Sequence, residues 1–361
     1  MSFDSVIDQE RPKSILQGAL GREVLASSYL FFGPRGVGKQ ALAMELAKAV
    51  NCQSEGRLPC DSCSACRRIR KSNYPDVHLY FPTAHPKKVK PEELQEAMRQ
   101  RAANPYFLPR YKESDAIHIE TIRKIEKEAN YTSYEAKRKV FILADADRMN
   151  LPAANALLKI LEEPPANVLF VLTAAQPSKL PATVLSRCQQ VRFARLSDAA
   201  VARALKTVPG ARPERIRLAS RLAQGNLGRA FELIQEEVQR NRAEALKSLT
   251  SALSGDLVST IKLAERLGRS RSPKAREEHL ETLQVWYRDM LLLLEGKEDS
   301  LINEDLKPQL REMANQYDWQ GVQRSLNLIQ DTRNALAANV NAELVWLVLF
   351  NKLRRQQRKP S

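Results

Sequence analysis

The chain has 361 residues, of which 43% are hydrophobic, and it carries a formal net charge of +15 with a pI near 9.7. This length suffices for two or three domains with real cores. The basic balance fits an anionic partner as well as an unspecific solvated surface. Met1–Gln9 is polar and acidic, unlike a secretory leader, and the longest apolar runs are too short to cross a bilayer. We therefore expect a cytoplasmic protein with reduced thiols and no membrane partner.

Short apolar strands alternate with amphipathic helices in the first half of the chain. The expected strands are Tyr29–Phe32, Val140–Leu143, Val168–Leu172 and Val191–Phe193. The expected helices are Ala41–Val50, Ile122–Ala129 and Ala153–Leu161. This alternation predicts an α/β fold, with a parallel sheet covered on both faces. The polar stretch around Pro82–Pro91 is expected to be an exposed insertion.

The strand signal ends after about Leu196. Three short helices are expected at Ala199–Lys206, Glu214–Ala223 and Leu227–Glu236, and the pattern from Ala243 to Arg355 is helical throughout. We expect three domains. They are an α/β domain at 1–195 with a cysteine module at 52–66, a small helical domain at 196–240, and an all-α domain at 243–361.

A phosphate-binding loop is expected between the first strand and its helix. Residues Gly33, Gly36, Gly38 and Lys39 match the pattern GxxxxGK, in which backbone N–H groups and a helix N-terminus face the anion. The pattern normally ends in Ser or Thr, whose hydroxyl ligates Mg²⁺. Gln40 stands there instead, and its amide fits the octahedral shell of Mg²⁺ poorly. The loop therefore permits ATP binding but with a weakened hold on the metal.

The acidic pair that completes such a site should follow the strand Val140–Leu143. Aligned on the strand, Ala144 takes the metal-side position and Asp145 the position of the usual catalytic Glu. A shifted register would make Asp145 the metal ligand, and Asp147 is a further candidate for residual hydrolysis. Because Gln40 and Ala144 both lack the metal-binding group, we do not expect the chain alone to be an efficient ATPase.

Four cysteines lie close together with the spacing C-x₇-C-x₂-C-x₂-C. They are Cys52, Cys60, Cys63 and Cys66. This spacing predicts a closed, structural Zn²⁺ site. An iron–sulfur cluster and free thiols are the alternatives, although Arg67 follows where the bacterial cluster pattern continues toward another Cys and Pro. The fifth cysteine, Cys188, is expected to be packed rather than reactive.

Three motifs give the chain a resemblance to a known family. Asn155–Pro165, Lys179-Leu180-Pro181 and Ser186-Arg187-Cys188 resemble the clamp-loader branch of the AAA+ ATPases, which includes the gamma/tau and delta-prime subunits of bacterial DNA polymerase III and the replication factor C small subunits. The resemblance spans about Phe3 to Phe193 and continues more weakly to Asn339–Leu344, which is similar to the family's collar. It implies an AAA+ domain, a helical lid and a collar that holds the protein in a hetero-oligomeric ring. It also implies the same zinc module in gamma and delta-prime subunits.

The resemblance assigns Arg187 as an arginine finger that reaches the γ-phosphate on a neighbouring subunit. A planar, permanently charged guanidinium suits that task. Other family positions are altered. Thr173 is followed by Ala174-Ala175-Gln176 where the polar sensor belongs, and Arg229 lies one residue late for the nucleotide-sensing position of the lid.

The resemblance thus implies a clamp-loader subunit of the delta-prime type, with gamma/tau and delta subunits as partners. It would reach the sliding clamp indirectly and primer–template DNA through the assembled complex. Basic groups such as Arg67–Lys71 and the tail up to Lys359 are candidates for phosphate contacts. An ATP-hydrolysing motor of the gamma/tau type is one alternative, and a zinc-dependent DNA-binding protein outside any ring is another.

Overall fold

The computed structural model describes the chain except for residues 1–2, 55, 57, 86–87, 108, 110, 113, 235–245, 248–249, 252, 271–272, 339 and 358–361. It divides into two compact units, Met1–Glu232 and Leu233–Ser361. Each unit is described by itself.

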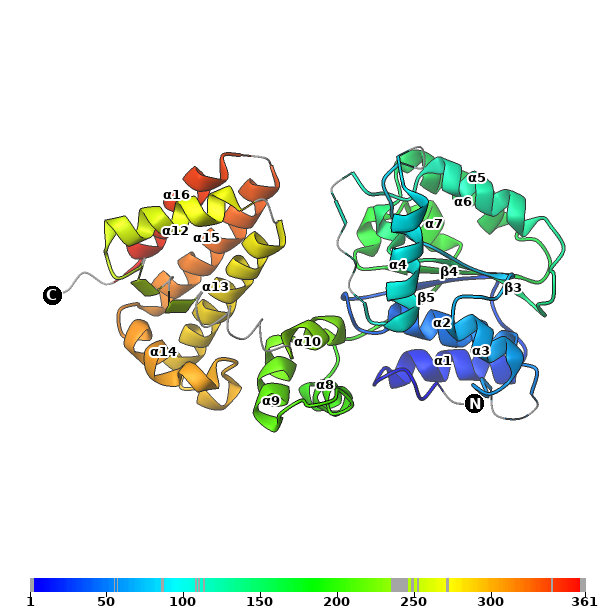
Figure 1. Cartoon of the computed structure of the whole chain (residues 1–361), viewed down its shortest axis with the longest axis horizontal. Helices are drawn as coiled ribbons and strands as arrows, with labels where there is room; N and C mark the ends of the chain where they lie inside the picture. The colour runs from blue at the N-terminus through cyan, green and yellow to red at the C-terminus, as the bar shows by residue number, and fades with distance from the viewer. Residues whose placement is uncertain are drawn as a thin grey trace. The chain divides into compact units, whose positions relative to one another are not determined.

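A five-stranded parallel sheet organises the first unit (Figure 1). Its strands are β1 (Ser28–Phe32), β2 (Val77–Tyr80), β3 (Lys139–Leu143), β4 (Val168–Ala174) and β5 (Gln189–Arg192). The spatial order is β2-β3-β4-β1-β5, so β1 is hydrogen-bonded to β4 on one side and β5 on the other. The loop after β1 therefore leaves the sheet between two strands, which is where open parallel sheets bind ligands.

Helices cover both faces of this sheet. One face carries α1 (Glu10–Gly21), α2 (Lys39–Val50) and α3 (Ser64–Arg70), and the other carries α5 (Ile119–Ala129), α6 (Leu151–Glu162) and α7 (Ala182–Ser186) (Figure 1). Successive side chains of a strand point to opposite faces. Leu30, Phe141 and Phe170 accordingly join the core beneath α5 and α6, and all three are fully buried.

The remaining elements of the first unit are an inserted helix and a small helical bundle. α4 (Pro91–Ala103) lies between β2 and α5 in the chain, and short 3₁₀ turns occur at Ala146–Arg148 and Pro177–Lys179. After the sheet come α8 (Asp198–Leu205), α9 (Pro213–Leu222) and α10 (Leu227–Leu233). The side chain of Ser197 caps α8 by accepting a hydrogen bond from Ala200 N.

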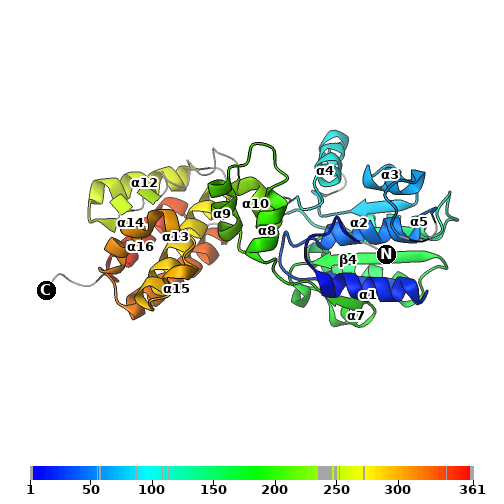
Figure 2. The ribbon, with the colours of Figure 1, turned by 90° about the horizontal axis from the view of Figure 1, so that it is seen from below.

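The second unit contains only helices in its described residues (Figure 2). They are α12 (Leu257–Arg269), α13 (Pro273–Leu294), α14 (Lys307–Ala314), α15 (Trp319–Ala337) and α16 (Ala342–Arg354), with 3₁₀ turns at Glu298–Ser300 and Glu304–Leu306. Their shared core includes Trp286, Tyr287, Tyr317 and Trp346. The hydroxyls of Tyr287 and Tyr317 are 3.0 Å apart, so these buried phenols satisfy each other.

The predicted fold class, an α/β phosphate-loop domain followed by helical domains, is confirmed by this architecture. All four expected strands and the expected helices of the first half are present, with ends shifted by one to three residues. The sequence-based prediction missed the strand β2 and the helices α1, α3, α4 and α7. Within the part of the chain that the structure describes, no helix combines the length and apolar character that crossing a bilayer requires.

The predicted domain limits at 195, 240 and 243 stay predictions. The limits at 240 and 243 fall in residues 235–245, which lie outside the described part. The same holds for Glu236, Asn339 and the tail residues Arg358 and Lys359. The polar stretch from Pro82 is only partly an exposed insertion. Lys88, Lys90 and Pro91 are exposed, whereas Pro82 is buried.

Candidate functional site

The phosphate loop has the expected conformation. It connects β1 to α2, and Gly33, Gly36 and Gly38 all have positive φ, at 143°, 69° and 98°. Glycine is required at Gly36 for a second reason, since an added Cβ would lie 1.7 Å from Oδ1 of Asn226. The loop is therefore shaped by backbone geometry that other residues adopt only with strain.

Lys39 is directed at the loop itself. Its Nζ donates hydrogen bonds to the carbonyl oxygens of Gly33 at 2.7 Å and Pro34 at 2.5 Å. The side chain is 7% exposed, and burial lowers the pKa of Lys39 to about 8, against the opposing effect of Asp145 and Asp147. The ammonium group would have to leave these carbonyls to contact a phosphate.

The metal side of the loop contains an arginine. The guanidinium of Arg101, on α4, donates hydrogen bonds to Oε1 of Gln40 and to the hydroxyl of Tyr111. Tyr111 in turn donates to Oδ2 of Asp145 at 2.6 Å, and Arg101 lies 3.7 Å from the same carboxylate. Burial, followed by the Asp145 charge, raises the pKa of Tyr111, so its phenol stays a donor.

The guanidinium of Arg101 also packs against an aromatic ring. It is 3% exposed, and its guanidinium carbon lies 4.4 Å from the ring centroid of Phe81, within cation–π range. A buried guanidinium needs a carboxylate and further hydrogen-bond acceptors, and Asp145, Gln40 and Tyr111 supply them. The positive charge of Arg101 thus lies between Gln40 and Asp145, the two positions at which a phosphate-loop site would have its metal-binding groups.

The two acidic residues after β3 form hydrogen bonds with other groups of the chain. Asp145 adopts a left-handed conformation with φ 51°, and its backbone N–H donates to Oγ1 of Thr173 at 3.0 Å. Asp147 accepts a hydrogen bond from the Gln176 N–H at 3.0 Å. Ala144 is buried. The structure therefore brings Asp145 and Thr173 to the loop, but it pairs both with other groups of the chain.

Two segments cover the loop. Tyr106, which is 7% exposed, places its ring so close to Gly38 that an added Cβ would lie 3.0 Å from the ring, and its hydroxyl accepts a hydrogen bond from Ile7 N at 2.9 Å. At the start of α10, the Leu227 N–H donates to Gly36 O at 2.9 Å. The cavity that remains at the loop measures about 50 Å³, which is enough for a few water molecules but not for a nucleoside triphosphate.

A larger hollow of about 460 Å³ adjoins α4. It shares Arg101, Phe107 and Pro109 with the loop cavity, but the described residues that line it come from 81–115 and Glu232 rather than from the phosphate loop.

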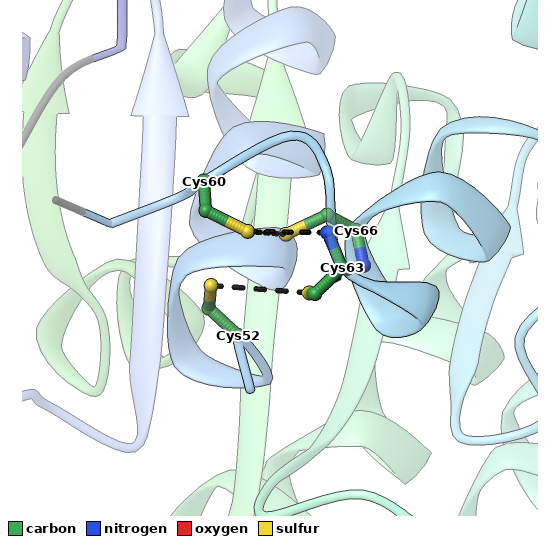
Figure 3. Close-up of side chains that lie close together, drawn as sticks. All are labelled: Cys52, Cys60, Cys63 and Cys66. Atoms are coloured by element: carbon green, nitrogen blue, oxygen red, sulfur yellow. Dashed lines mark hydrogen bonds between the residues drawn. The ribbon is translucent and has the colours of Figure 1, made fainter. Parts of the chain in front are cut away.

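The four cysteines converge as the spacing predicts (Figure 3). The Sγ atoms of Cys52 and Cys63 are 4.0 Å apart, as are those of Cys60 and Cys66, and all four lie within 4.8 Å of one another. A tetrahedral Zn²⁺ with bonds of about 2.3 Å requires sulfur atoms about 3.8 Å apart. The cluster fits Zn²⁺ with a small contraction.

Local hydrogen bonds favour the thiolate at Cys60 and Cys63, whereas burial raises the pKa of Cys66. Cys63 caps α3, and its Sγ accepts a hydrogen bond from Cys66 N at 3.4 Å, while Cys60 Sγ accepts from Cys63 N at 3.3 Å. Hydrogen bonds from Ser54 and other neighbours lower the pKa of Cys60 to about 5, which favours the thiolate that a metal needs. The cluster consists of four cysteines among the described residues, a ligand set typical of closed structural zinc sites.

Arg187 lies at the end of α7, away from the described residues that line the loop cavity. Its guanidinium forms an ion pair with Glu162, the last residue of α6, and donates a hydrogen bond to Thr183 O at 3.0 Å. Its side chain is 33% exposed. The neighbouring Cys188 is buried in the core, and burial raises its pKa to about 12, so it is packed as expected.

The start of α10 also approaches the phosphate loop. Arg229 pairs with Glu232 of its own helix at 3.1 Å, and the residue that reaches the phosphate loop is Asn226, one step before α10. Near the cysteines, Arg67, Arg70 and Lys71 are exposed, whereas Arg68 is paired with Glu135 at 2.7 Å. Sequence reasoning missed Arg101, Tyr106 and Tyr111, because no motif marks residues that reach the loop only through the tertiary fold.

Comparisons with known proteins bear on the whole chain. The family model described as DNA polymerase III, delta subunit matches residues 8–197, and that described as DNA polymerase III, delta subunit, C terminal matches residues 236–355. A DNA polymerase III subunit delta' of Bacillus subtilis is 30% identical over 338 residues, 93% of each chain. A delta' subunit of Pseudomonas aeruginosa is 31% identical over 66% of this chain and 65% of its own.

More distant proteins complete the comparison. The tau subunit of B. subtilis is 26% identical over 99% of this chain, which spans only 58% of that relative. A solved gamma subunit-related protein of Thermotoga maritima is 17% identical, with a TM-score of 0.44 and coverage of 95% of this chain and 99% of its own. The expected resemblance is confirmed by the two family models and the delta' relatives: the chain belongs to the DNA polymerase III delta-subunit family.

Proposed function

We propose that the protein is the delta-prime-type subunit of a DNA polymerase III clamp loader whose own phosphate loop does not use nucleotide. Arg187 then serves as the arginine finger for an ATP-binding neighbour. The observation that carries the first part is the Arg101–Gln40 hydrogen bond, which puts a fixed cation on the metal side of the loop. The cytoplasmic location expected from the sequence stays a prediction.

Electrostatics and space both oppose Mg·ATP at this loop. A divalent ion beside Gln40 would be repelled by the guanidinium of Arg101. Because this guanidinium is buried, solvent screens its charge only weakly. The phosphates would also have to displace Tyr106 and release Lys39 from its two carbonyl partners. Each step has a cost in free energy, and together they favour a loop that stays closed.

The setting of Arg187 suits a role toward another chain. Its partner Glu162 is 48% exposed, and solvent-exposed ion pairs contribute only about 0–1 kcal/mol. A neighbour's γ-phosphate, with a greater charge and a geometry that matches the guanidinium fork, competes well with such a pair. Loss of one intramolecular ion pair is thus a small barrier to finger insertion.

The second unit supports assembly. Several apolar side chains on α12 and α16, helices that pack against each other, are exposed: Leu257, Val258, Ile261, Leu344 and Val348. Exposed apolar residues on packed helices are a common feature of subunit contacts. We propose that they contribute to the collar shared with gamma/tau and delta subunits, so that the clamp and primer–template DNA are reached only through the complex.

The test is ATP turnover in a reconstituted assembly of this chain with gamma/tau and delta subunits. Arg187→Ala should lower turnover by about 10³-fold at the pocket it serves, the lower end of the effect of trans arginine fingers. Arg123→Ala, which removes an exposed arginine of α5, is the matched control and should have no effect. Full turnover by the Arg187→Ala assembly would refute the finger role.

A gamma/tau-type motor is the alternative, because the tau relative matches nearly the full chain and Lys39 is present. Turnover by this chain alone that is abolished by Lys39→Ala would favour the motor. A zinc-dependent DNA-binding protein outside any ring would instead ignore gamma/tau and delta in gel filtration and bind DNA by itself.

A further inference from the structure

The segment that covers the phosphate loop is tied together at its base. It leaves the sheet after β2 and returns before α5, and its two ends pair through Thr83 and Ala116. Thr83 N donates to Ala116 O at 3.1 Å, and Ala116 N donates to Thr83 O at 3.0 Å. This antiparallel bridge brings the residues just beyond it, His85 on one end and His118 on the other, to the same place. The segment between them carries Arg101 and Tyr106.

Three metal-ligating side chains meet beside the bridge. His85, His118 and Glu120 each place one ligand atom within 4.8 Å of the others. Nε2 of His85 lies 3.9 Å from Oε1 of Glu120, and the two imidazole rings meet edge to face with centroids 5.1 Å apart. Each of the three is contributed by a segment whose backbone is fixed.

The backbones of both histidines are held by hydrogen bonds. His118 caps α5, and its carbonyl accepts from Thr121 N at 3.1 Å. The carbonyl of His85 accepts from Lys88 N at 2.7 Å. Nε2 of His118 is buried and has no hydrogen-bond partner in the described structure. A buried ring nitrogen without a partner is costly unless something else satisfies the imidazole.

We propose that His85, His118 and Glu120 form a second metal site, which binds a divalent transition ion such as Zn²⁺, Co²⁺ or Ni²⁺. Two imidazoles and a carboxylate suit these borderline ions rather than Ca²⁺ or Mg²⁺. Three protein donors leave a position for water, so the site differs from the closed cysteine cluster.

Small side-chain movements suffice to form the site. Donor atoms around a tetrahedral Zn²⁺ with bonds of about 2.05 Å lie about 3.3 Å apart, so the present separations must contract by at most about 1.5 Å. His85 and Glu120 are 41% and 48% exposed and can rotate without disturbing a core. The same exposure makes the ion exchangeable.

The bound ion would join both ends of the covering segment. It would restrict the fluctuations of the chain between His85 and His118 and so hold Arg101 and Tyr106 more firmly over the loop. This site is independent of the proposed clamp-loader role, because its ligands belong to neither the cysteine cluster nor the Arg187 region.

The test is a Co²⁺ titration of the full-length chain with its cysteine-bound zinc measured beforehand. One further equivalent of Co²⁺ should bind, with the weak visible absorption of nitrogen and oxygen ligands. His85→Ala and His118→Asn should each weaken this binding by at least about tenfold, since even outer-shell changes at metal sites cost that much. We choose His118→Asn because asparagine is a favourable residue at the N-cap of a helix.

Controls and a second measurement separate the site from nonspecific binding. Glu120→Gln should weaken binding, whereas Glu92→Gln, at an exposed acid in the first turn of α4, should not. Tryptic cleavage near Lys88 and Arg99 should slow when Co²⁺ is added to the parent chain but not to the His118→Asn variant. Thiolate-to-cobalt absorption alone, no added equivalent, or binding unchanged by His85→Ala would each overturn the proposal.

Discussion

The guanidinium of Arg101 donates a hydrogen bond to the amide oxygen of Gln40, the residue that stands where a phosphate loop carries its metal-binding hydroxyl. The absence of that hydroxyl and the presence of a buried cation are connected, because the residue that replaces the hydroxyl binds the cation. Ser or Thr at this position would be too short to reach the arginine in the same way, while Gln extends toward it. On the proposed function, the charge of Arg101 takes the place of a bound ion beside the loop.

Arg101→Ala should destabilise the first unit. It removes a buried cation and leaves Asp145 and Tyr111 without a shared partner, a change that costs about 3 kcal/mol in comparable buried pairs. Urea unfolding measures the effect. Arg99→Ala, at an exposed position of the same helix, should change the free energy of unfolding by less than about 0.5 kcal/mol. Equal effects of both changes would mean that Arg101 has no special role.

Gln40→Thr should not restore Mg²⁺-dependent nucleotide binding by itself. The hydroxyl would return, but Arg101 and Tyr106 would still occupy the site. Titration with a fluorescent ATP analogue, with and without Mg²⁺, measures this. Only the combination with Arg101→Ala removes the competing cation, and tight Mg²⁺-dependent binding to the single variant would contradict the closed-loop interpretation.

Lys39 predicts a specific pH dependence. Burial lowers its folded pKa to about 8, while the unfolded chain keeps the ordinary value of 10.5. Between these values the unfolded state binds more protons, so this group makes the free energy of unfolding rise with pH. Relative to Lys39→Met, the parent chain should gain up to about 3 kcal/mol between pH 8 and 10.5 and show a constant difference below pH 8. Parallel stability curves across that range would argue against the depressed pKa.

Removal of the metal from the cysteine cluster should destabilise its surroundings. Cys52 follows Asn51, the residue that caps the C-terminus of α2. The carbonyl of Cys52 accepts a hydrogen bond from Lys137 Nζ at 2.7 Å, so the module is attached to the loop before β3. Cys60→Ser should abolish stoichiometric zinc and lower the melting temperature, as a strong chelator should in the parent chain. Cys188→Ala should retain one zinc per chain, and metal analysis of both variants makes the comparison.

Glu162→Gln should separate stability from function at the finger. The pair with Arg187 is partly exposed, so its loss should cost less than about 1 kcal/mol. If Glu162 only holds Arg187 between turnovers, the assembled loader should keep its ATPase activity, in contrast to Arg187→Ala. A loss as large as that of Arg187→Ala would assign Glu162 a more direct part.

The sequence alone determined the features that depend on local pattern. The strand, glycine loop and helix around Gly33–Lys39 follow from period and composition, and the cysteine spacing predicted a cluster that the fold forms. The family motifs also predicted a membership that the comparisons confirm. In each case the informative residues are neighbours in the chain.

Only the tertiary structure decided what fills the loop. Arg101 is separated from Gln40 by 61 positions, and its helix reads as an ordinary polar one in the sequence. The same is true of His85 and His118, which meet because a single antiparallel bridge closes the segment between them. Contacts of this kind form between residues that are far apart in the chain. Residue type and periodicity do not reveal which of these distant side chains will come into contact in the folded protein.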